Sequence, residues 1–375
     1  MNYKLFLSKT IKISGLGLLV FFVYNALIDP YEISPLRIPI ARINAMKPAT
    51  DNFGRVHKSY QPLYLNSQTL ILGNSRVDRG FRPEDIGDSK VFNGSYPGAV
   101  PGELILNIKT AYALNPQLKT ILIGVDLMMF NHLRRPSQVE YTISGKNPLS
   151  IYLDAVSKFL KMSLSWDTAV QSYKTVVYNL NNTNVVFYSR QGHFSFFDYT
   201  PFNEVDRVSD QLLTTYASET DVFKNYKISQ QNLEQLQNII AFCKDTSIEL
   251  KIFITPTHPV MQELLLQLGL WPDWEEWKRE LVKMAPIYDF STYNEFTTEP
   301  LGQDMKYYYE VAHFKPALGA ILLRDLLKPE GSHAIVTVQN VDEKLLAHQQ
   351  QHLQWQKDNP KMSERVHLVL EKLKK

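Results

Sequence analysis

The sequence predicts an α/β protein built on a parallel five-stranded sheet, with a largely helical insertion and an apolar helix at the amino end. Apolar, strand-like runs alternate with helix-like segments on both sides of a stretch of roughly a hundred residues where the alternation stops. Ahead of them, residues 13–28 form an apolar run preceded by lysines. Strands and helices that alternate in this way indicate parallel strands joined by helical crossovers.

Composition narrows the class of protein. A chain of 375 residues that is 44% hydrophobic can bury a full core in one large domain. The 40 Lys and Arg residues nearly balance the 38 Asp and Glu residues, so the net charge of +2 gives no general attraction to nucleic acid. The single cysteine, Cys243, lies on the apolar face of a predicted helix. We therefore expect a core thiol and no disulfide within the chain.

The apolar run 13–28 predicts a transmembrane helix that anchors the protein in the cytoplasmic membrane. Lysines before the run and acidic residues just after it predict an amino terminus inside and the remaining chain outside, which for a bacterium means the periplasm or the cell surface. No small-residue cleavage site follows Ile28, which favours an uncleaved signal anchor over a cleaved signal peptide. The alternative is a buried amino-terminal helix in a cytoplasmic protein.

Four parts are expected along the chain. Residues 1–30 are the anchor, and residues 31–66, rich in proline, basic residues and tyrosine, form an extended connector. Residues 67–330 are the α/β domain, in which an insertion at about 130–228 caps the carboxyl edge of the sheet. Residues 331–375 form a polar helical tail, expected to be peripheral and solvated.

The five strands are expected at 68–74, 90–94, 118–126, 249–255 and 286–290. The main helices are expected at 101–113, 151–160, 167–179 and 229–244. The nearly continuous apolar character of 118–126 is typical of a strand covered on both faces.

Ser75 is the leading candidate for a nucleophile. The first strand stops at Gly73 and places Ser75 on the turn before a helix, at the carboxyl edge where open α/β sheets bind ligands. A serine nucleophile needs a base and an orienting carboxylate, and Glu310-x-x-His313 supplies both in one short segment. Asp289, at a strand end, is a second possible orienting acid. The alternative role for this serine is a helix cap.

The order of motifs resembles the SGNH (GDSL-like) hydrolase superfamily, and more narrowly its membrane-anchored bacterial members similar to the alginate and teichoic acid modification proteins. The matching segments are Gly73-Asn74-Ser75, Asn93-Gly94-Ser95-Tyr96-Pro97-Gly98, Gly124-Val125-Asp126-Leu127 and Glu310-Val311-Ala312-His313. The resemblance covers roughly 68–327, interrupted by the insertion, and implies a flavodoxin-like sheet.

The resemblance also implies roles for single residues. Ser75 would be the nucleophile, His313 the base, and Glu310 the orienting acid in place of the aspartate of the family. The backbone N–H groups of Ser75 and Ser95 would hold the oxyanion. The oxyanion and substrate-binding candidates are Asn93, Gly94, Ser95, Asp126, Arg76 and His258.

Asp126 departs from the family pattern, in which an asparagine donates its amide to the oxyanion. An ionised Asp126 would repel that charge, so its carboxyl must be protonated, be turned away or play another part. Other candidates also have structural alternatives. Asn93 can form a turn, Asp126 can cap a strand end, and His258 can be an ordinary loop histidine. Arg76 and Arg79 either position an anionic or acylated glycan or form a surface pair.

The predicted function is that of a serine esterase or O-acyltransferase. The resemblance implies an acylated glycan or small acyl ester as substrate, a cell-envelope polysaccharide as its source, and envelope-modification proteins as partners. The alternative is a catalytically inactive glycan-binding or assembly factor with the same fold. No P-loop, His-Glu-x-x-His or Cys-x-x-Cys motif occurs, so neither a cofactor nor a metal is expected.

Overall fold

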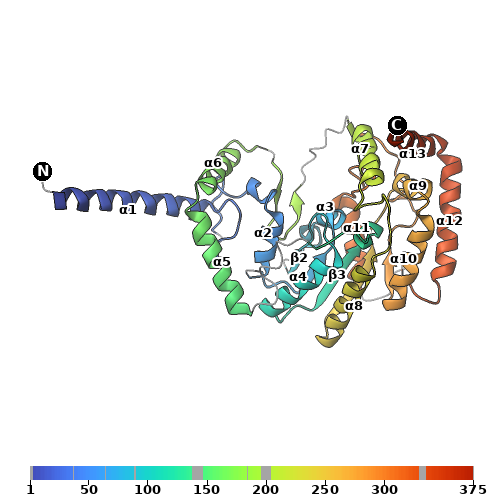
Figure 1. Cartoon of the computed structure of the whole chain (residues 1–375), viewed down its shortest axis with the longest axis horizontal. Coiled ribbons are helices and arrows are strands. Elements are labelled where there is room, and N and C mark those ends of the chain that lie inside the picture. Colours follow the sequence, from blue (N-terminus) through green and yellow to red (C-terminus); the bar gives the residue numbers. More distant parts are fainter. Residues whose placement is uncertain are drawn as a thin grey trace.

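The computed structural model of the chain describes residues 3–36, 38–63, 65–87, 90–136, 147–183, 185–195, 204–328 and 335–374. Within these ranges the main sheet has six strands in the order β2-β1-β3-β6-β7-β8 (Figure 1). Their bounds are β1 Thr69–Leu72, β2 Val91–Asn93, β3 Thr120–Val125, β6 Glu249–Ile254, β7 Ile287–Asp289 and β8 Ile335–Val336. The first five are mutually parallel, which confirms the predicted α/β class with a mainly parallel sheet.

The prediction of five strands is wrong, because β8 adds a sixth at the edge of the sheet. It pairs antiparallel with β7, with Val336 opposite Ile287. The run Ala334-Ile-Val-Thr-Val338 is strand-like in sequence, but it stands in the tail, and nothing local to it indicates that it pairs with the last strand of the main sheet. The strand covers an edge of β7 that would otherwise be open.

The two faces of the sheet are buried against different helices. Along β1, Leu70 and Leu72 join one core with residues of α4 (Pro101–Leu114) and α8 (Gln230–Asp245). Ile71, which points to the opposite face, joins a second core. That core includes residues of α3 (Ser75–Gly80) and α11 (Pro316–Leu326), as expected for the two-residue repeat of a strand.

Two glycines bring α11 directly against α3. A Cβ atom on Gly319 would lie 1.8 Å from the carbonyl oxygen of Gly80. A Cβ atom on Gly80 would lie 2.0 Å from the ring of Phe314. Because α3 begins at Ser75 and Phe314 follows His313, this close contact sets how near the two ends of the α/β domain approach each other.

The segment predicted as an extended connector is folded instead. It contains a short helix at Pro48–Thr50, α2 at Gly54–Tyr60 and a further turn of helix at Gln61–Leu63. Lys58 is only 3% exposed. The prediction failed because the partners of this lysine lie in α3 and in the insertion, far along the chain.

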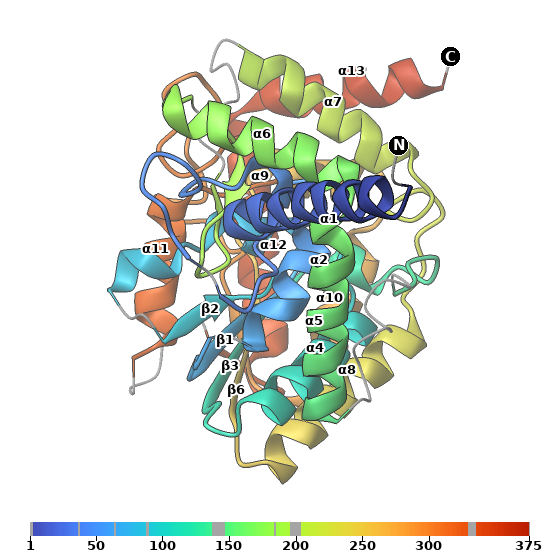
Figure 2. The same ribbon diagram turned by 90° about the vertical axis from the view of Figure 1, so that its left-hand side faces the viewer.

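The insertion does not form one cap. Its helices α5 (Pro148–Ser163) and α6 (Trp166–Leu180) pack beside the amino-terminal helix, away from the sheet (Figures 1 and 2). A hairpin of β4 (Phe187–Tyr188) and β5 (Phe194–Ser195) lies against α3. The third helix, α7 (Val205–Ser218), packs on helices near the carboxyl end of the chain.

The carboxyl-terminal segment is part of the core, so the expectation of a solvated, peripheral tail is wrong. Its helices α12 (Val341–Asp358) and α13 (Pro360–Leu373) pack on α9 (Pro259–Gln267), and α12 also contacts α10 (Trp271–Met284). Polar side chains conceal this role in the sequence, because the buried residues of α12 include two histidines. His348 binds Gln262 at 2.8 Å, and His352 pairs with Glu263 at 2.9 Å.

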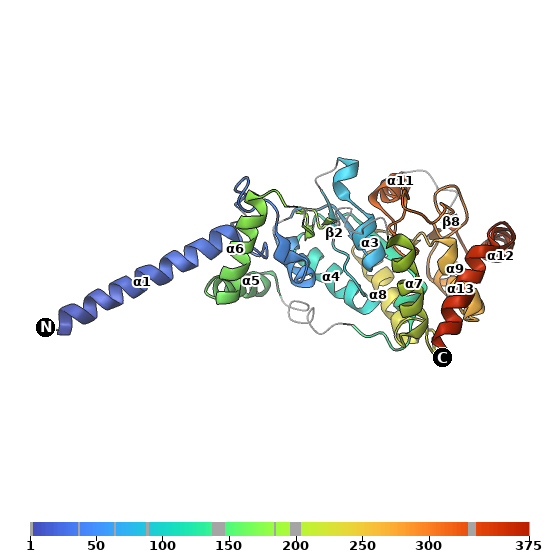
Figure 3. The same cartoon turned by 90° about the horizontal axis from the view of Figure 1, so that it is seen from above.

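The amino-terminal helix α1 (Tyr3–Ile28) projects from the rest of the molecule (Figures 1 and 3). Its length and composition are sufficient to cross a membrane, and most of it is exposed. A signal sequence would have the same properties.

We predict that Gly319→Ala destabilises the protein. Alanine normally stabilises a helix more than glycine does, but here its methyl group would collide with the backbone of Gly80. Overpacking of this kind costs about 1–3 kcal/mol, measurable from the urea unfolding midpoint of the detergent-solubilised chain. Gly302→Ala is the matched control, because no atom lies within 4 Å of its Cβ position. Equal stability of the two variants would contradict the close contact.

Candidate active site

Ser75, His313 and Glu310 form a hydrogen-bonded chain at the carboxyl edge of the sheet. The Nε2 atom of His313 lies 3.0 Å from Oγ of Ser75. The Nδ1 atom of His313 contacts Oε1 of Glu310, whose other oxygen accepts the N–H of Ala312 at 2.6 Å. With Nδ1–H donating to the carboxylate, Nε2 is free to accept the serine proton. The three side chains therefore have the connectivity of a nucleophile, base and orienting acid.

Local structure explains why these groups meet. Asn74 caps α3 by accepting the N–H of Arg76 at 3.1 Å, so that Ser75 becomes the first residue of the helix directly after β1. The loop that carries His313 closes on itself, with Tyr309 N donating to the carbonyl of His313 at 2.9 Å.

Burial and charge set the protonation states. Burial lowers the pKa of His313, and the neighbouring Arg79 cation lowers it further, while Glu310 opposes both. The Nη1 atom of Arg79 lies 3.3 Å from Nδ1 of His313. Burial would raise the pKa of Glu310, but His313, the N–H of Ala312 and Arg79 together hold it below its usual value. The imidazole is therefore neutral, and the carboxylate ionised, near neutral pH.

Asp126 is turned into the protein and engaged by other groups. Its Oδ2 atom accepts the amide of Asn74 at 2.6 Å and lies 3.3 Å from Nε of Arg76. Its Oδ1 atom accepts the N–H of Met129 at 3.2 Å, which caps a short helix at Leu127–Phe130. Asp126 therefore plays the other part left open by the sequence: it neutralises a buried arginine and positions Asn74 beside Ser75.

The predicted oxyanion role of the Ser95 backbone is not supported by the geometry. Its N–H donates to Oδ1 of Asn93 at 3.0 Å, and the N–H of Gly94 donates to the carbonyl of Ile71 at 2.8 Å. The amide of Asn93 binds the carbonyl of Phe81 at 2.8 Å, so this side chain joins β2 to the end of α3. By contrast, the Ser95 hydroxyl is fully buried and has no hydrogen-bond partner among the described residues.

Two further candidates prove to be structural. His258 caps α9, with Nδ1 accepting the N–H of Val260 at 3.3 Å and Nε2 lying 2.8 Å from the carbonyl oxygen of Glu299. Burial lowers the pKa of His258 to about 4, so it stays neutral. Asp289 does not orient His313, because it pairs with Lys278 at 2.8 Å.

Arg76 is also buried and held by several groups. Besides Asp126, it donates to the hydroxyl of Thr257 at 3.1 Å, and Tyr216 is among the groups that raise its pKa. Thr257 follows a predicted strand at the carboxyl edge of the sheet, so the sequence indicated that it could lie near Ser75. No such indication exists for Tyr216, which comes from the helix α7 of the insertion.

A second buried charge pair supports α3 from the other side. Lys58 binds Oδ1 of Asp78 at 2.5 Å and also contacts the carbonyl oxygen of Ser95. The hydroxyl of Tyr188 donates to Oδ2 of Asp78 at 3.0 Å. This pair was missed in the sequence, since its members come from the supposed connector, from α3 and from the insertion.

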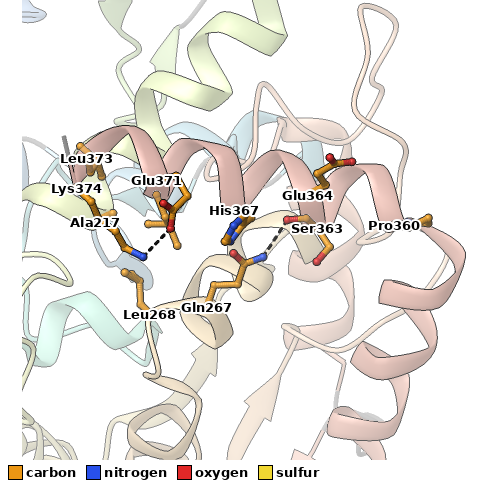
Figure 4. A pocket seen from close by; sticks show the side chains of 11 residues that line it. Ala217, Gln267, Leu268, Pro360, Ser363, Glu364, His367, Glu371, Leu373 and Lys374 are labelled. Carbon is orange, nitrogen blue, oxygen red and sulfur yellow. Dashed lines mark hydrogen bonds and ion pairs between the residues drawn. The ribbon is translucent and has the colours of Figure 1, made fainter.

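A large groove lies away from the three aligned side chains of the site. This groove, of about 880 Å³, runs along α13 and is lined by Gln267, Leu268, Ser363 and His367, among others (Figure 4). None of the three aligned groups borders it. Ser75 itself is 9% exposed.

Comparisons with known proteins add little. No protein-family model matches the chain, and no curated protein does. Among solved structures, one similar chain is described as "a putative platelet activating factor from Streptococcus pneumonia". It is 14% identical, and the match covers 75% of this chain and 97% of that chain with a TM-score of 0.35. At that TM-score the likeness supports no conclusion about function, which must come from the site itself.

The position of Arg79 leads to a prediction about pH. His313 must be neutral to accept a proton, so reaction of Ser75 with a fluorophosphonate should fall as pH drops through the pKa of His313. Arg79 lowers that pKa, and Arg79→Gln should therefore move the acidic limb of the labelling rate to higher pH. Arg82→Gln is the control, because Arg82 is not among the charges that shift His313. Identical acidic limbs for wild type and Arg79→Gln would contradict this electrostatic role.

Proposed function

We propose that this chain is a serine esterase or O-acyltransferase of the SGNH type, acting on acyl esters of a cell-envelope polysaccharide. The single observation that supports the chemistry most directly is the 3.0 Å contact between Ser75 Oγ and His313 Nε2, with Glu310 on the far side of the ring. We further propose that α1 anchors the protein with its amino terminus inside and the site outside the cytoplasmic membrane. Partner proteins of envelope modification belong to the same proposal.

The first half of the proposed reaction uses the three aligned side chains. Ser75 Oγ attacks the ester carbonyl carbon while its proton passes to Nε2 of His313, giving a tetrahedral oxyanion and an imidazolium paired with Glu310. The oxyanion collapses, the ester C–O bond breaks, and His313 returns the proton to the departing alcohol. An acyl group then remains on Ser75.

In the second half, His313 removes a proton from an incoming hydroxyl, whose oxygen attacks the acyl-serine carbonyl and gives a second tetrahedral oxyanion. When this oxyanion collapses, the bond between Ser75 Oγ and the acyl carbon breaks, and His313 returns the proton to Ser75 Oγ, which restores the free serine. Water as the acceptor gives hydrolysis, and a glycan hydroxyl gives transfer. The narrow exposure of Ser75 favours an acceptor that is bound and oriented over free access of bulk water.

Two donors are proposed for the oxyanion. The N–H of Ser75 is at the first position of α3 and has no acceptor within the helix. The unpaired Ser95 hydroxyl is the second donor, replacing the backbone N–H that is bound to Asn93. Ser95 lies near the nucleophile, since the following residue, Tyr96, donates its N–H to the carbonyl of Gly73 at 3.3 Å.

The triad is tested with Ser75→Ala and Glu310→Gln. We expect Ser75→Ala to lose fluorophosphonate labelling and hydrolysis of p-nitrophenyl acetate. Glu310→Gln should lower kcat by roughly 10³–10⁴-fold, because the imidazolium loses its counter-charge. Ser150→Ala, which changes a half-buried serine in the first turn of α5, is the control. If neither labelling nor hydrolysis differs between wild type and Ser75→Ala, the proposed enzyme is rejected, and the alternative is an inactive glycan-binding or assembly factor.

Ser95→Ala tests the second oxyanion donor. Removing one such donor typically lowers kcat by about 10²–10³-fold and affects substrate binding much less. We therefore expect a fall in kcat for p-nitrophenyl acetate with a nearly unchanged KM, and an unchanged unfolding midpoint because no hydrogen bond is lost. A normal kcat would exclude the Ser95 hydroxyl from the reaction while leaving the triad intact.

A further inference from the structure

The helices α5 and α6 form a hairpin at the base of the projecting helix α1. Both run across the direction of α1 rather than along it (Figures 1 and 3). The ring of Phe21 stacks on Trp166 with centroids 6.2 Å apart, and Phe22 packs edge-on against Phe159 at 6.4 Å. The amide of Asn25 donates to the carbonyl of Ser163 at 3.0 Å. The hairpin is therefore attached to the last part of α1.

The helix α6 has its polar face buried and its apolar face exposed. The residues that it buries are Thr168, Ser172, Thr175 and Asn179. The large apolar residues that it exposes are Trp166, Val170, Tyr173 and Leu180, at 74%, 37%, 65% and 59%. Their spacing of four, three and seven residues places them on one side of the helix. A helix of a soluble domain has the opposite arrangement, with its apolar stripe toward the core.

The helix α5 extends the same apolar surface. Its exposed large hydrophobic residues are Leu149, Tyr152, Leu153, Leu160 and Leu164. At the end of α1, which contacts both helices and is long and apolar enough to span a membrane, Val23, Tyr24 and Leu27 are exposed too. Large contiguous apolar surfaces of this kind mark contact with a membrane or a partner.

We propose that the outer face of the α5–α6 hairpin lies in the interfacial layer of a phospholipid bilayer, beside a membrane-spanning α1. The inference rests on the proposed anchor. Phe21, which meets Trp166, precedes the end of α1 by seven residues, or about 10 Å of helix. Interfacial helices insert their apolar faces about 5–10 Å deep, which agrees with this position.

The chemistry of the surface favours lipid over a second protein. Tryptophan and tyrosine are enriched at the level of lipid headgroups, where an apolar ring meets water at one end. The exposed Lys161 and Lys174 follow Leu160 and Tyr173 directly, and long lysine side chains can extend from an apolar face to lipid phosphates. Docking of the hairpin would hold the α/β domain at a set height and orientation, so that Ser75 acts on substrates close to the membrane.

Trp166 allows a direct test, because it is exposed and the other four tryptophans are buried. The others, Trp271, Trp274, Trp277 and Trp355, are at most 8% exposed. The full chain is reconstituted into phosphatidylcholine vesicles with and without 6,7-dibromo-phosphatidylcholine, and tryptophan fluorescence is compared. We expect the brominated lipid to quench one component that is also shielded from aqueous iodide. Trp166→Phe should lose that component, and the matched control Trp355→Phe should keep it.

Two results would overturn the proposal. If Trp166 remains open to iodide and unaffected by brominated lipid, the hairpin stands clear of the membrane. If Trp166 is shielded from iodide but not quenched by brominated lipid, protein rather than lipid covers this face. Resistance of the reconstituted chain to carbonate extraction reports insertion of α1 separately, and extraction would remove the basis of the inference. Fluorophosphonate labelling of Ser75 reports the proposed chemistry independently of both.

Discussion

The hydrogen bond between Ser75 and His313 joins residues 238 positions apart, and much of the architecture is needed to form it. β1 must end at the carboxyl edge, and the chain must return beside it after the last parallel strand. The distance between His313 and Ser75 depends on the contact of α11 with α3, where Gly319 and Gly80 pack too closely to allow a side chain. The bond thus requires the parallel sheet, the last crossover and the small residues together.

Buried charge is the second constraint around Ser75. Arg76 is neutralised by Asp126 on one side of α3, and Asp78 is neutralised by Lys58 on the other. A buried ion whose partner is removed is costly, so each pair needs the protein to close over it completely. Closure is supplied by the folded segment before β1 and by the insertion, through Tyr188 and Tyr216. These segments, which look like linkers in the sequence, enclose the site.

Different parts of the same insertion face different surroundings. The β4–β5 hairpin and α7 pack against the α/β domain, whereas α5 and α6 turn their apolar residues outward beside α1. The inverted face of α6 is consistent with a lipid environment and costly in water. A single chain therefore connects the proposed membrane contact to the groups that surround Ser75.

Much of the site could be predicted from the sequence, because the proposed nucleophile, base and acid lie in short segments whose local patterns are strong. An apolar run that ends at Gly73 places Ser75, and the Glu310-x-x-His313 spacing brings acid and base together within one loop. The role of Asp126, the engaged backbone of Ser95 and the capping role of His258 required the tertiary structure, since each depends on a partner from another element. The same reason applies to β8, to Lys58 and to the buried histidines of α12. Local sequence determined which polar side chains lie at the carboxyl edge of the sheet. Only the tertiary structure decided which of them are already hydrogen-bonded or ion-paired to other parts of the protein.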